Sequence, residues 1–510
     1  MTLHLSIVLW LPLAAGLLAL LAGPAARWLA LAGTAATLAY AIALVVDFES
    51  GAGGLQYVTD EMWISELGIH YKLGVDGLNL FLIALAALLW VPTTLWAGRE
   101  GYDRPGLFFF WLGLGESAVL GALMAQDLAL FVVFFDLMLI PFFFLTGGWG
   151  GANRVPAVMK LVIYTLVGSL LMLTAAVATG VLAPAGDGIT FALSDLARAD
   201  ARLPQGSQDW IFLCFAAAFL VKMPAFPLHG WMPDGYKAMP LPVLAVFSGV
   251  LSKVAAYGFL RIALPLFPDA AAQFQDLLLV IALASILYGS VVAFTTTDAR
   301  LVLGYSSVAQ LGFIVLGIFA LRPEGAQGAV IQAVNHGLVV APAFFILALL
   351  AARAGDSEDL RDMGGIALRA PVLATMFLIV ALANLAMPGS ANFVGEFLIL
   401  LGVFNAKIVI AIVAFTGVAL ASVYTLRLFI RAMHNRPGAD VTSREMSVGD
   451  GLVLVPLVVC ILALALYPQL ALKKDERAVL QAVRPAAEIA APSQPFDDAA
   501  VEAAAREPAP

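Results

Sequence analysis

Residues 210–231 read WIFLCFAAAFLVKMPAFPLHGW, an apolar run in which Lys222 stands two residues before Pro224. The next apolar run, LPVLAVFSGVLSKVAAYGFL at residues 241–260, carries a second lysine, Lys253. A charge near the centre of a bilayer costs roughly 3 kcal/mol on insertion scales, so it is rarely found there without a function. Two such lysines in consecutive helices indicate a proton or ion pathway through the middle of the protein.

The composition is that of a membrane protein. Of the 510 residues, 62% are hydrophobic and only 12% are charged, which excludes an ordinary soluble protein. A spanning helix needs about 20 apolar residues. The chain contains fourteen such segments, which predict one polytopic α-helical membrane domain over residues 1–472. Their centres lie near residues 12, 36, 88, 116, 137, 168, 216, 252, 285, 311, 340, 387, 418 and 460. Residues 473–510 are rich in Ala, Pro and Glu, so we expect a polar, flexible tail there.

Basic residues are distributed unevenly over the predicted loops. Of the twenty lysines and arginines outside the helix interiors and the tail, fourteen fall in loops after odd-numbered helices and six in loops after even-numbered helices. The positive-inside rule then places the odd-numbered loops in the cytoplasm and both termini on the non-cytoplasmic side. Because no Lys or Arg precedes the first apolar run, we expect that run to be a retained helix rather than a signal peptide. The sequence therefore predicts a multi-pass protein of the inner, cytoplasmic membrane.

The sequence lacks the motifs of redox centres. Its two cysteines, Cys214 and Cys460, lie in separate apolar runs and form no C-x-x-C, so neither an iron–sulfur cluster nor a zinc site is expected. No G-x-G-x-x-G follows a predicted strand, which excludes a dinucleotide-binding domain. The net charge of −8 comes largely from the outer loops and the tail, and it implies no nucleic-acid partner. Any redox chemistry would therefore belong to another chain.

Six ionisable residues fall well inside the fourteen segments. In chain order they are Glu116, Asp136, Lys222, Lys253, His336 and Glu396. A carboxylate beside a buried lysine stabilises the charged lysine, and moving the carboxylate away favours release of the proton. We therefore interpret Asp136 and Lys222 as a proton switch. Lys253 and His336 can pass the proton on, since histidine titrates near neutral pH, and Glu396 can serve as the terminal acceptor.

Structural roles stay open for two of these residues. A membrane histidine such as His336 either takes part in proton transfer or hydrogen-bonds a neighbouring helix. Gln332, one turn before it, is either its structural partner or a further member of the relay. For Glu116 a structural and a functional role are equally balanced.

Polar residues near the helix ends also allow two interpretations. His229 and Asp234 lie in PLHGWMPDG, at the cytoplasmic end of the seventh helix, where they either order the loop or take up protons. Long cationic side chains near a membrane interface often extend to water without any function. This interpretation suits Arg261 and Lys407.

Two of the predicted helices are interrupted by proline. Met223-Pro224 lies in the seventh helix and Met387-Pro388 in the twelfth, each beside an ionisable residue. A proline there frees a backbone carbonyl, which is tolerated in a buried or wet site, and discontinuous helices form the ion sites of transporters with inverted repeats. The breaks lie five helices apart, and an odd number of helices per unit inverts the second unit in the membrane relative to the first. We therefore expect inverted five-helix repeats over helices 4–8 (residues 107–263) and 9–13 (residues 275–431), with ordinary proline kinks as the alternative.

Five segments carry a specific resemblance to a known family. They are VDGLNLFLIAL (75–85), FFDLMLIPFFFLTGGWGG (134–151), KMPAFPLHGWMPDGYKAMPLPVLAVFSGVLSKVAAYGFLR (222–261), LGYSSVAQLGFIVLG (303–317) and MPGSANFVGEFLIL (387–400). Over about residues 70–435 the chain resembles the antiporter-like subunits of respiratory complex I. The same superfamily includes subunits of multisubunit cation/proton antiporters and of membrane-bound hydrogenases.

The resemblance implies fourteen helices in two inverted repeats, a proton channel along a hydrated central axis, and a place in a proton-translocating NADH:quinone oxidoreductase. It carries the family's helix-five acid onto Asp136, its helix-seven lysine onto Lys222 and its helix-eight lysine onto Lys253. The helix-eleven histidine falls on His336 and the helix-twelve acid on Glu396. Flavin, iron–sulfur clusters and quinone would be bound by partner subunits, and the L- and N-type antiporter-like subunits would be its neighbours in the bilayer. Those two types usually carry lysine at the last position, so glutamate favours the M type.

Two positions depart from the pattern of the family. The helix-five acid is usually glutamate, and Asp136 is one methylene shorter, so we expect the acid–lysine distance to be longer or bridged by water. The motif SSVAQLGF has Gln310 where the family often has histidine. Glutamine can order water but does not titrate, so Gln310 is given no titrating role.

Two other functions stay open. One is a subunit of a multisubunit cation/proton antiporter that is driven by ion gradients, which the same lysines would serve. The other is a purely structural membrane-arm subunit, against which the presence of Lys222, Lys253 and Glu396 argues.

Overall fold

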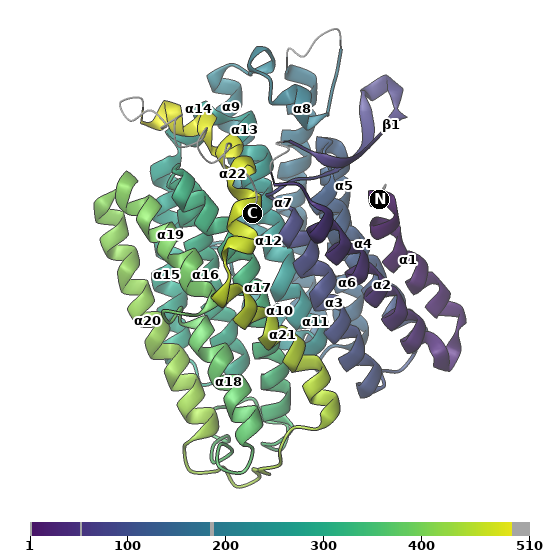
Figure 1. The fold of residues 1–510 in the computed structure, drawn as a ribbon, viewed down its shortest axis with the longest axis vertical. Helices are drawn as coiled ribbons and strands as arrows, with labels where there is room; N and C mark the ends of the chain where they lie inside the picture. The colour runs from purple at the N-terminus through teal and green to yellow at the C-terminus, as the bar shows by residue number, and fades with distance from the viewer. Residues whose placement is uncertain (1–2, 51–53, 184–187, 492–510) are drawn as a thin grey trace.

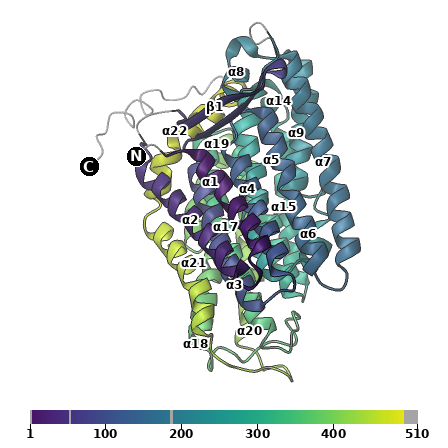
Figure 2. The ribbon, with the colours of Figure 1, turned by 90° about the vertical axis from the view of Figure 1, so that its right-hand side faces the viewer.

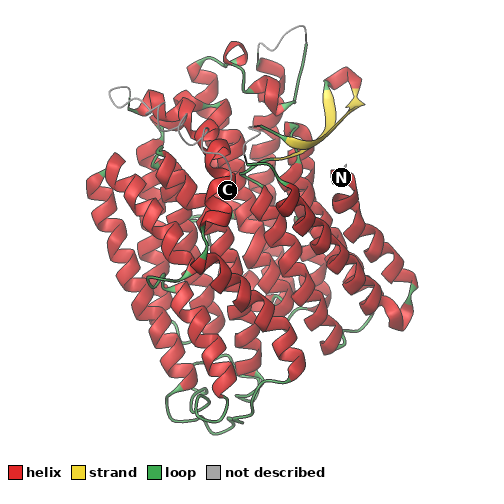
Figure 3. Ribbon diagram, viewed as in Figure 1, coloured by secondary structure: helices red, strands yellow, loops and turns green. Residues whose placement is uncertain are grey.

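The computed structural model describes the whole chain except residues 1–2, 51–53, 184–187 and 492–510. The described residues form a bundle of helices that run roughly side by side, with one two-stranded hairpin at one end (Figures 1 and 3). The hairpin and the short helix α14 (Pro268–Gln273) lie at the upper end in Figure 1, whereas the loops that adjoin α18 and α20 lie at the lower end. In the view turned by 90°, α7 lies along the flank of the bundle away from α21 (Figure 2).

The helices of the bundle follow the predicted apolar segments closely. They are α1 (Leu5–Leu21), α2 (Ala26–Asp47), α3 (Leu80–Glu100), α4 (Pro105–Met124), α5 (Leu128–Leu137), α6 (Leu139–Trp149), α7 (Arg154–Leu182), α9 (Gln205–Lys222), α10 (Met232–Ala238), α11 (Leu241–Val246), α12 (Ser252–Gly258), α13 (Leu264–Leu266), α15 (Gln275–Thr295), α16 (Ala299–Phe319), α17 (Pro323–Ala351), α18 (Pro371–Asn384), α19 (Ala391–Ala406), α20 (Ile408–Met433) and α21 (Val448–Leu466). Thirteen of the fourteen predicted centres lie in these helices, and the remaining one, residue 387, lies between α18 and α19.

Within the part of the chain that the structure describes, eleven helices are long and apolar enough to cross a membrane, and three shorter apolar helices, α1, α18 and α19, accompany them. The helical membrane fold is therefore confirmed. The count of fourteen crossings and the inverted repeats stay predictions.

Burial separates the central helices from those that face outward. The segment Leu241–Leu266 and helix α17 are buried along the whole of their most apolar stretch, and α16 almost so. Helices α2, α20 and α21 bury only a third of theirs. Because lipid is as apolar as leucine, an apolar helix can face the bilayer. The buried lysines and the histidine lie on or beside the central helices.

Both expected breaks are present. Helix α9 ends at Lys222, and the chain reaches α10 through an irregular stretch that begins at Met223. Helix α18 ends at Asn384, and α19 begins at Ala391. Between them Gly389 has φ +91°, a left-handed conformation that glycine adopts without steric cost.

The predicted eighth helix contains two π-helical turns. From α11 the chain continues through Phe247–Leu251 in π conformation, then α12, then Phe259–Ala263 in π conformation, and ends in α13. Such turns are rare and occur frequently at functional sites. Here they flank the short α-helical piece that carries Lys253.

Residues 56–75 form a β-hairpin that was not predicted from the sequence. Strand β1 (Gln56–Ile64) pairs antiparallel with β2 (Ile69–Val75), with Asp60 opposite Lys72. The Asp60 carboxylate lies 3.0 Å from the Lys72 ammonium. A polar hairpin of this kind belongs outside the apolar layer.

The prediction of a flexible tail from residue 473 onward is wrong for residues 473–490. These residues belong to α22 (Gln469–Ala490), which packs against α17, α14 and α13. Its buried residues recur at helical spacing, at Ala471, Asp475, Val479, Ala482, Val483 and Ala486. This spacing gives α22 one apolar face that the bundle covers. Residues 492–510 of the expected tail lie outside the described residues.

Candidate functional site

Lys222, the last residue of α9, points into the interior and is only 7% exposed. Its Nζ donates a hydrogen bond to the carbonyl oxygen of Phe135 and lies 3.8 Å from the centroid of the Phe135 ring. Asp136, the next residue in the chain, accepts a hydrogen bond from the Ser169 hydroxyl at 2.5 Å. Among the ion pairs of the described residues, none joins Asp136 to Lys222 directly. The lysine is therefore held beside the acid by a backbone carbonyl, in line with the shorter reach of aspartate.

Lys253 is completely buried in α12, between the two π-helical turns. Its Nζ donates a hydrogen bond to the carbonyl oxygen of Ser248 at 2.6 Å. The hydroxyl of Ser252 is buried and has no hydrogen-bond partner among the described residues. Unpaired polar groups are uncommon in a protein interior, so the residue directly before Lys253 offers a free hydrogen-bonding position.

His336 is completely buried in α17, and neither of its ring nitrogens has a partner among the described residues. The neighbouring Gly337 lies so close to the eighth helix that a Cβ on it would be 2.6 Å from the carbonyl oxygen of Gly249. That carbonyl lies four residues before Lys253. Two glycines thus bring the helices of Lys253 and His336 into close backbone contact.

Glu396 lies in α19, 2% exposed, at the end of a chain of amide hydrogen bonds. Gln332 of α17 donates from Nε2 to Oε1 of Gln310 at 2.8 Å, and Gln310 of α16 donates from Nε2 to Oε1 of Glu396 at 2.8 Å. The second oxygen of Glu396, Oε2, has no partner among the described residues. Within the described residues, Gln332 therefore donates a hydrogen bond to Gln310 and makes none to His336, and the carboxylate keeps one oxygen free.

A further buried polar cluster, which the sequence analysis missed, continues from Gln310 toward the break of the twelfth helix. Ser306 lies one turn before Gln310 and donates to the hydroxyl of Tyr424 at 3.1 Å. Asn384, the last residue of α18, donates to Ser306 at 3.2 Å and to Thr425 at 3.0 Å. The sequence signal was the pair of polar residues at i and i+4, Ser306 and Gln310, in the mainly apolar α16.

Three further candidates, Glu116, His229 and Asp234, make no hydrogen bond or ion pair with these residues within the described part of the chain. Both carboxylate oxygens of Glu116 are buried in α4 without a partner among the described residues. His229 packs against aromatic rings, with its centroid 4.8 Å from that of Tyr288. Asp234 is exposed and pairs with Lys160 at 2.7 Å. No hydrogen bond or ion pair within the described residues joins any of the three to Lys222 or the other central residues.

The interpretation of Arg261 as a side chain that merely extends to the interface is wrong. Arg261 forms an ion pair with Asp76, which is 6% exposed, and its Nε donates to the hydroxyl of Tyr257 at 3.0 Å. Lys407, by contrast, forms a surface ion pair with Asp276 at 2.8 Å. The sequence signal for the buried pair was the acid in VDGLNL, which precedes the apolar run LFLIALAALLWVP.

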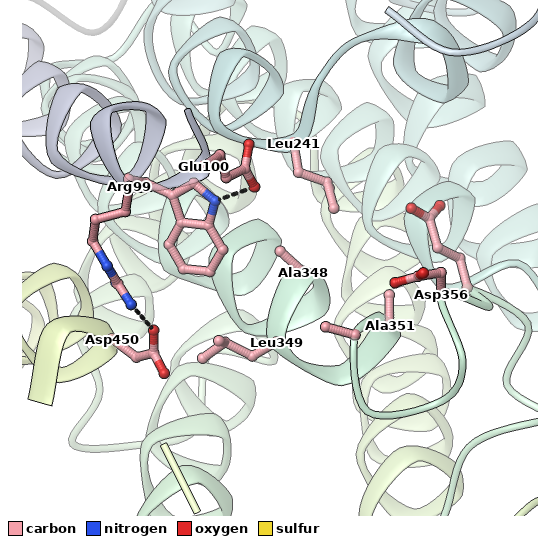
Figure 4. Close-up of a pocket in the computed structure, with 11 residues that line it drawn as sticks. Arg99, Glu100, Leu241, Ala348, Leu349, Ala351, Asp356 and Asp450 are labelled. Carbon is pink, nitrogen blue, oxygen red and sulfur yellow. Dashed lines mark hydrogen bonds and ion pairs between the residues drawn. The ribbon is translucent and has the colours of Figure 1, made fainter. Parts of the chain in front are cut away.

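A cavity of about 400 Å³ opens where α3 and α17 end and α11 and α21 begin. Figure 4 shows the side chains that line it. It is lined by ends of α3, α11, α17 and α21 and by the loop that holds Asp356. The guanidinium of Arg99 pairs with Asp450 at 2.8 Å and the Trp96 indole donates to Glu100 at 2.6 Å on its walls (Figure 4). None of the central ionisable residues lines this cavity.

In the described part of the chain no group of three or more His, Cys, Asp or Glu side chains could hold a metal ion.

Comparison with known proteins gives a consistent result. A family described as "NADH:quinone oxidoreductase/Mrp antiporter, TM" matches residues 125–421. The chain is 36% identical to NADH-quinone oxidoreductase subunit M of Rhodobacter capsulatus, over 91% of this chain and 93% of the relative. It is similar to a chain of respiratory complex I from Thermus thermophilus with bound NADH, with a TM-score of 0.87, 31% identity, and coverage of 95% of this chain and 100% of the other. It shares its fold with a chain of the Mrp complex from Dietzia sp. DQ12-45-1b, with a TM-score of 0.79, 21% identity, and coverage of 96% and 98%.

Proposed function

Because this chain belongs to the NADH:quinone oxidoreductase/Mrp antiporter family, we propose that it is the antiporter-like, proton-translocating M-type subunit of an NADH–quinone oxidoreductase. The observation that carries the proposal is that Asp136, Lys222, Lys253, His336 and Glu396 all lie within the matched residues, in helices of one bundle. All except Asp136 are buried. Ionisable residues inside a membrane bundle are expensive and mark proton relays.

The proposed chemistry of this chain is proton transfer. NADH, flavin, iron–sulfur clusters and quinone belong to partner subunits in this proposal, and the L- and N-type antiporter-like subunits are its neighbours in the bilayer. The protein lies in the inner, cytoplasmic membrane with both termini on the non-cytoplasmic side. The distribution of basic residues over the loops supports this orientation.

In the proposed mechanism, quinone reduction on a partner changes the electrostatic field along the membrane. Lys222, held at the Phe135 carbonyl, then moves toward or away from Asp136, which the Ser169 hydroxyl holds in place. The presence of a nearby carboxylate decides whether the buried lysine keeps its proton. One proton thus leaves Lys222 when the pair opens and returns when it closes.

The proton passes from Lys222 through Lys253 and His336 to Glu396. Buried polar atoms without hydrogen-bond partners among the described residues accompany this route, on Ser252 and His336. Such atoms are where buried water makes its hydrogen bonds, so water supplies the links between the side chains. Glu396 receives the proton on Oε2, because Oε1 is held by the amide of Gln310.

Gradient-driven cation/proton antiport is the second candidate function, because the fold is shared with a chain of an Mrp complex. The two functions differ in the subunits that accompany the chain. Purification of the native complex discriminates them: redox subunits with flavin and iron–sulfur clusters support the proposed function, and a complex of membrane chains alone supports the antiporter.

The test is NADH-driven proton uptake by inverted membrane vesicles that carry Lys222→Ala, compared with wild type at matched assembly. Loss of both proton uptake and quinone-linked NADH oxidation is expected. Lys407→Ala is the matched control, since Lys407 makes only a surface ion pair and should leave both rates unchanged. Normal uptake in Lys222→Ala would overturn the mechanism.

A further inference from the structure

The eighth helix carries polar side chains beyond Lys253, in the direction away from Ser248. Tyr257 and Arg261 follow at steps of four residues, each a rise of about 6 Å along a helix. The two side chains touch, because Arg261 Nε donates to the Tyr257 hydroxyl at 3.0 Å. The polar face of this buried helix therefore leads from the centre of the bundle toward the end that carries the hairpin.

The polar face continues onto other elements at that end. Arg261 pairs with Asp76, in the turn that precedes α3, and Gln126 donates to the Tyr257 hydroxyl at 3.4 Å. Tyr257 accepts from both Arg261 and Gln126, which leaves its own hydroxyl hydrogen to be donated. Asp76 and Tyr257 are both buried, so the cluster is shielded from bulk water although it lies near the end of the bundle.

Helix α22 covers this cluster. Gly77 follows Asp76, and a Cβ on Gly77 would lie 2.2 Å from the carbonyl oxygen of Lys474 and 2.6 Å from Cα of Asp475. Only glycine permits this approach. Asp475 is 1% exposed, and its Oδ1 accepts a hydrogen bond from Gln327 of α17 at 2.8 Å. Its Oδ2 is buried and has no partner among the described residues.

A carboxyl group with a free buried oxygen is costly for a helix whose other buried residues are apolar. An asparagine would keep the size of the side chain and an oxygen that accepts from Gln327, without a carboxyl group. The acid is therefore explained better by proton transfer than by the docking of the helix.

We propose that Tyr257, the Asp76–Arg261 pair and Asp475 form a second, outward proton branch that leads from Lys253 to the face covered by α22. The proposal rests on the proposed function and adds a route that does not pass through His336 and Glu396. Tyr257, Asp76 and Asp475 transfer protons, one at each step and without electrons. Arg261 positions Asp76 through their ion pair. A proton on Oδ2 of Asp475 leaves to water at the edge of α22.

The test uses the intact complex in inverted vesicles and measures the protons moved per NADH oxidised. Asp475→Asn keeps the size of the side chain and an oxygen that can accept from Gln327, but it cannot transfer a proton. We expect it to lower the ratio while assembly is unchanged. Glu476→Gln, the adjacent acid on the same helix, is the matched control and should keep the wild-type ratio.

A second variant separates transfer from the docking of α22. Tyr257→Phe removes one oxygen on the eighth helix and leaves every residue of α22 unchanged, and it should lower the ratio as Asp475→Asn does. A wild-type ratio in assembled Tyr257→Phe would overturn the branch, whatever Asp475→Asn does to assembly. Lys222→Ala in the same assay tests the proposed function itself. Normal proton pumping by this variant would contradict the proposed function. An inactive Lys222→Ala together with a wild-type ratio in Tyr257→Phe and Asp475→Asn would contradict the outward branch alone.

Discussion

Lys222 donates its hydrogen bond to the carbonyl oxygen of Phe135, the residue directly before Asp136. Helix α5 ends at Leu137, so this carbonyl is one of the last four of the helix, which have no partner within a regular helix. The end of a helix also carries a partial negative charge that favours a cation. The break between α5 and α6 thus provides a backbone carbonyl that binds the ammonium group of Lys222 next to Asp136, without a direct ion pair between the two side chains.

Because the carbonyl and not the carboxylate binds Lys222, the length of the side chain at position 136 should affect proton transfer. Asp136→Asn removes the charge and should lower NADH-driven proton uptake on the order of a hundredfold, the usual contribution of a positioned proton-transfer group. Asp136→Glu adds a methylene, brings the carboxylate toward Lys222, and should keep uptake within a fewfold of wild type. Uptake is measured in inverted vesicles at equal complex content. If Asp136→Glu were inactive and Asp136→Asn active, the proposed role of Asp136 and Lys222 as a proton switch would be contradicted.

The amide chain to Glu396 gives a second prediction. Gln310→Leu removes the donor to Oε1, and an unsatisfied buried acceptor costs about 1–3 kcal/mol. The ionised form of Glu396 is destabilised, so we expect slower proton uptake in an assembled complex. Gln310→His keeps a donor at the same position and should retain more activity than leucine. Infrared difference spectra of the carboxyl stretch, with Glu396→Gln to assign the band, would report the change directly. An unshifted band in Gln310→Leu would argue against this role.

Much of this site could be predicted because a charge in an apolar helix is visible in the sequence. Lys222, Lys253 and Glu396 stand out against long apolar runs, and the prolines in Met223-Pro224 and Met387-Pro388 mark the breaks. These are local signals, since the cost of an intramembrane charge and the lack of a proline N–H depend on one residue and its neighbours.

The contacts that tune the site could not be predicted in this way. The partner of Lys222 is a backbone carbonyl, which every residue has, and the bond from Gln310 to Glu396 depends on how α16 and α19 pack. The π-helical turns beside Lys253 depend on tertiary context as well. Helix α22 was missed because its charged residues outweigh its narrow apolar face, so its composition resembles that of a solvated tail.

Close packing at Gly395 gives a third prediction. A Cβ there would lie 2.4 Å from Oε1 and 2.8 Å from Cβ of Gln332. Gly395→Ala therefore overpacks the α17–α19 contact, at a cost of about 1–3 kcal/mol, and displaces Gln332 from Gln310. We expect a lower thermal stability of the purified complex together with slower proton uptake. Gly147→Ala is the control, because a Cβ on Gly147 would have nothing within 4 Å and alanine favours a helix. Equal stability of the two variants would contradict the packing argument.

The docking of α22 should depend on pH through Asp475. Burial raises the pKa of this carboxyl well above that of a free aspartate, about 3.9. The docked helix therefore keeps a proton that the undocked helix has already released, so raising the pH above about 4 progressively favours undocking. The charged residues beside it are Lys474 and Glu476 on α22, and the Asp76–Arg261 pair lies beneath.

Hydrogen exchange of residues 469–490 in the intact complex, corrected for the intrinsic effect of pH, measures this docking. Protection should fall as the pH rises in wild type, by up to about tenfold for each unit by which the docked pKa exceeds the undocked one. Asp475→Asn cannot titrate and should show protection that does not change with pH. Glu476→Gln leaves the buried Asp475 in place, so its protection should still fall as the pH rises, because burial is the largest cause of the raised pKa of Asp475. Protection that is independent of pH in wild type would mean that Asp475 has the same proton affinity in the docked and undocked helix. The buried acid would then need no functional explanation.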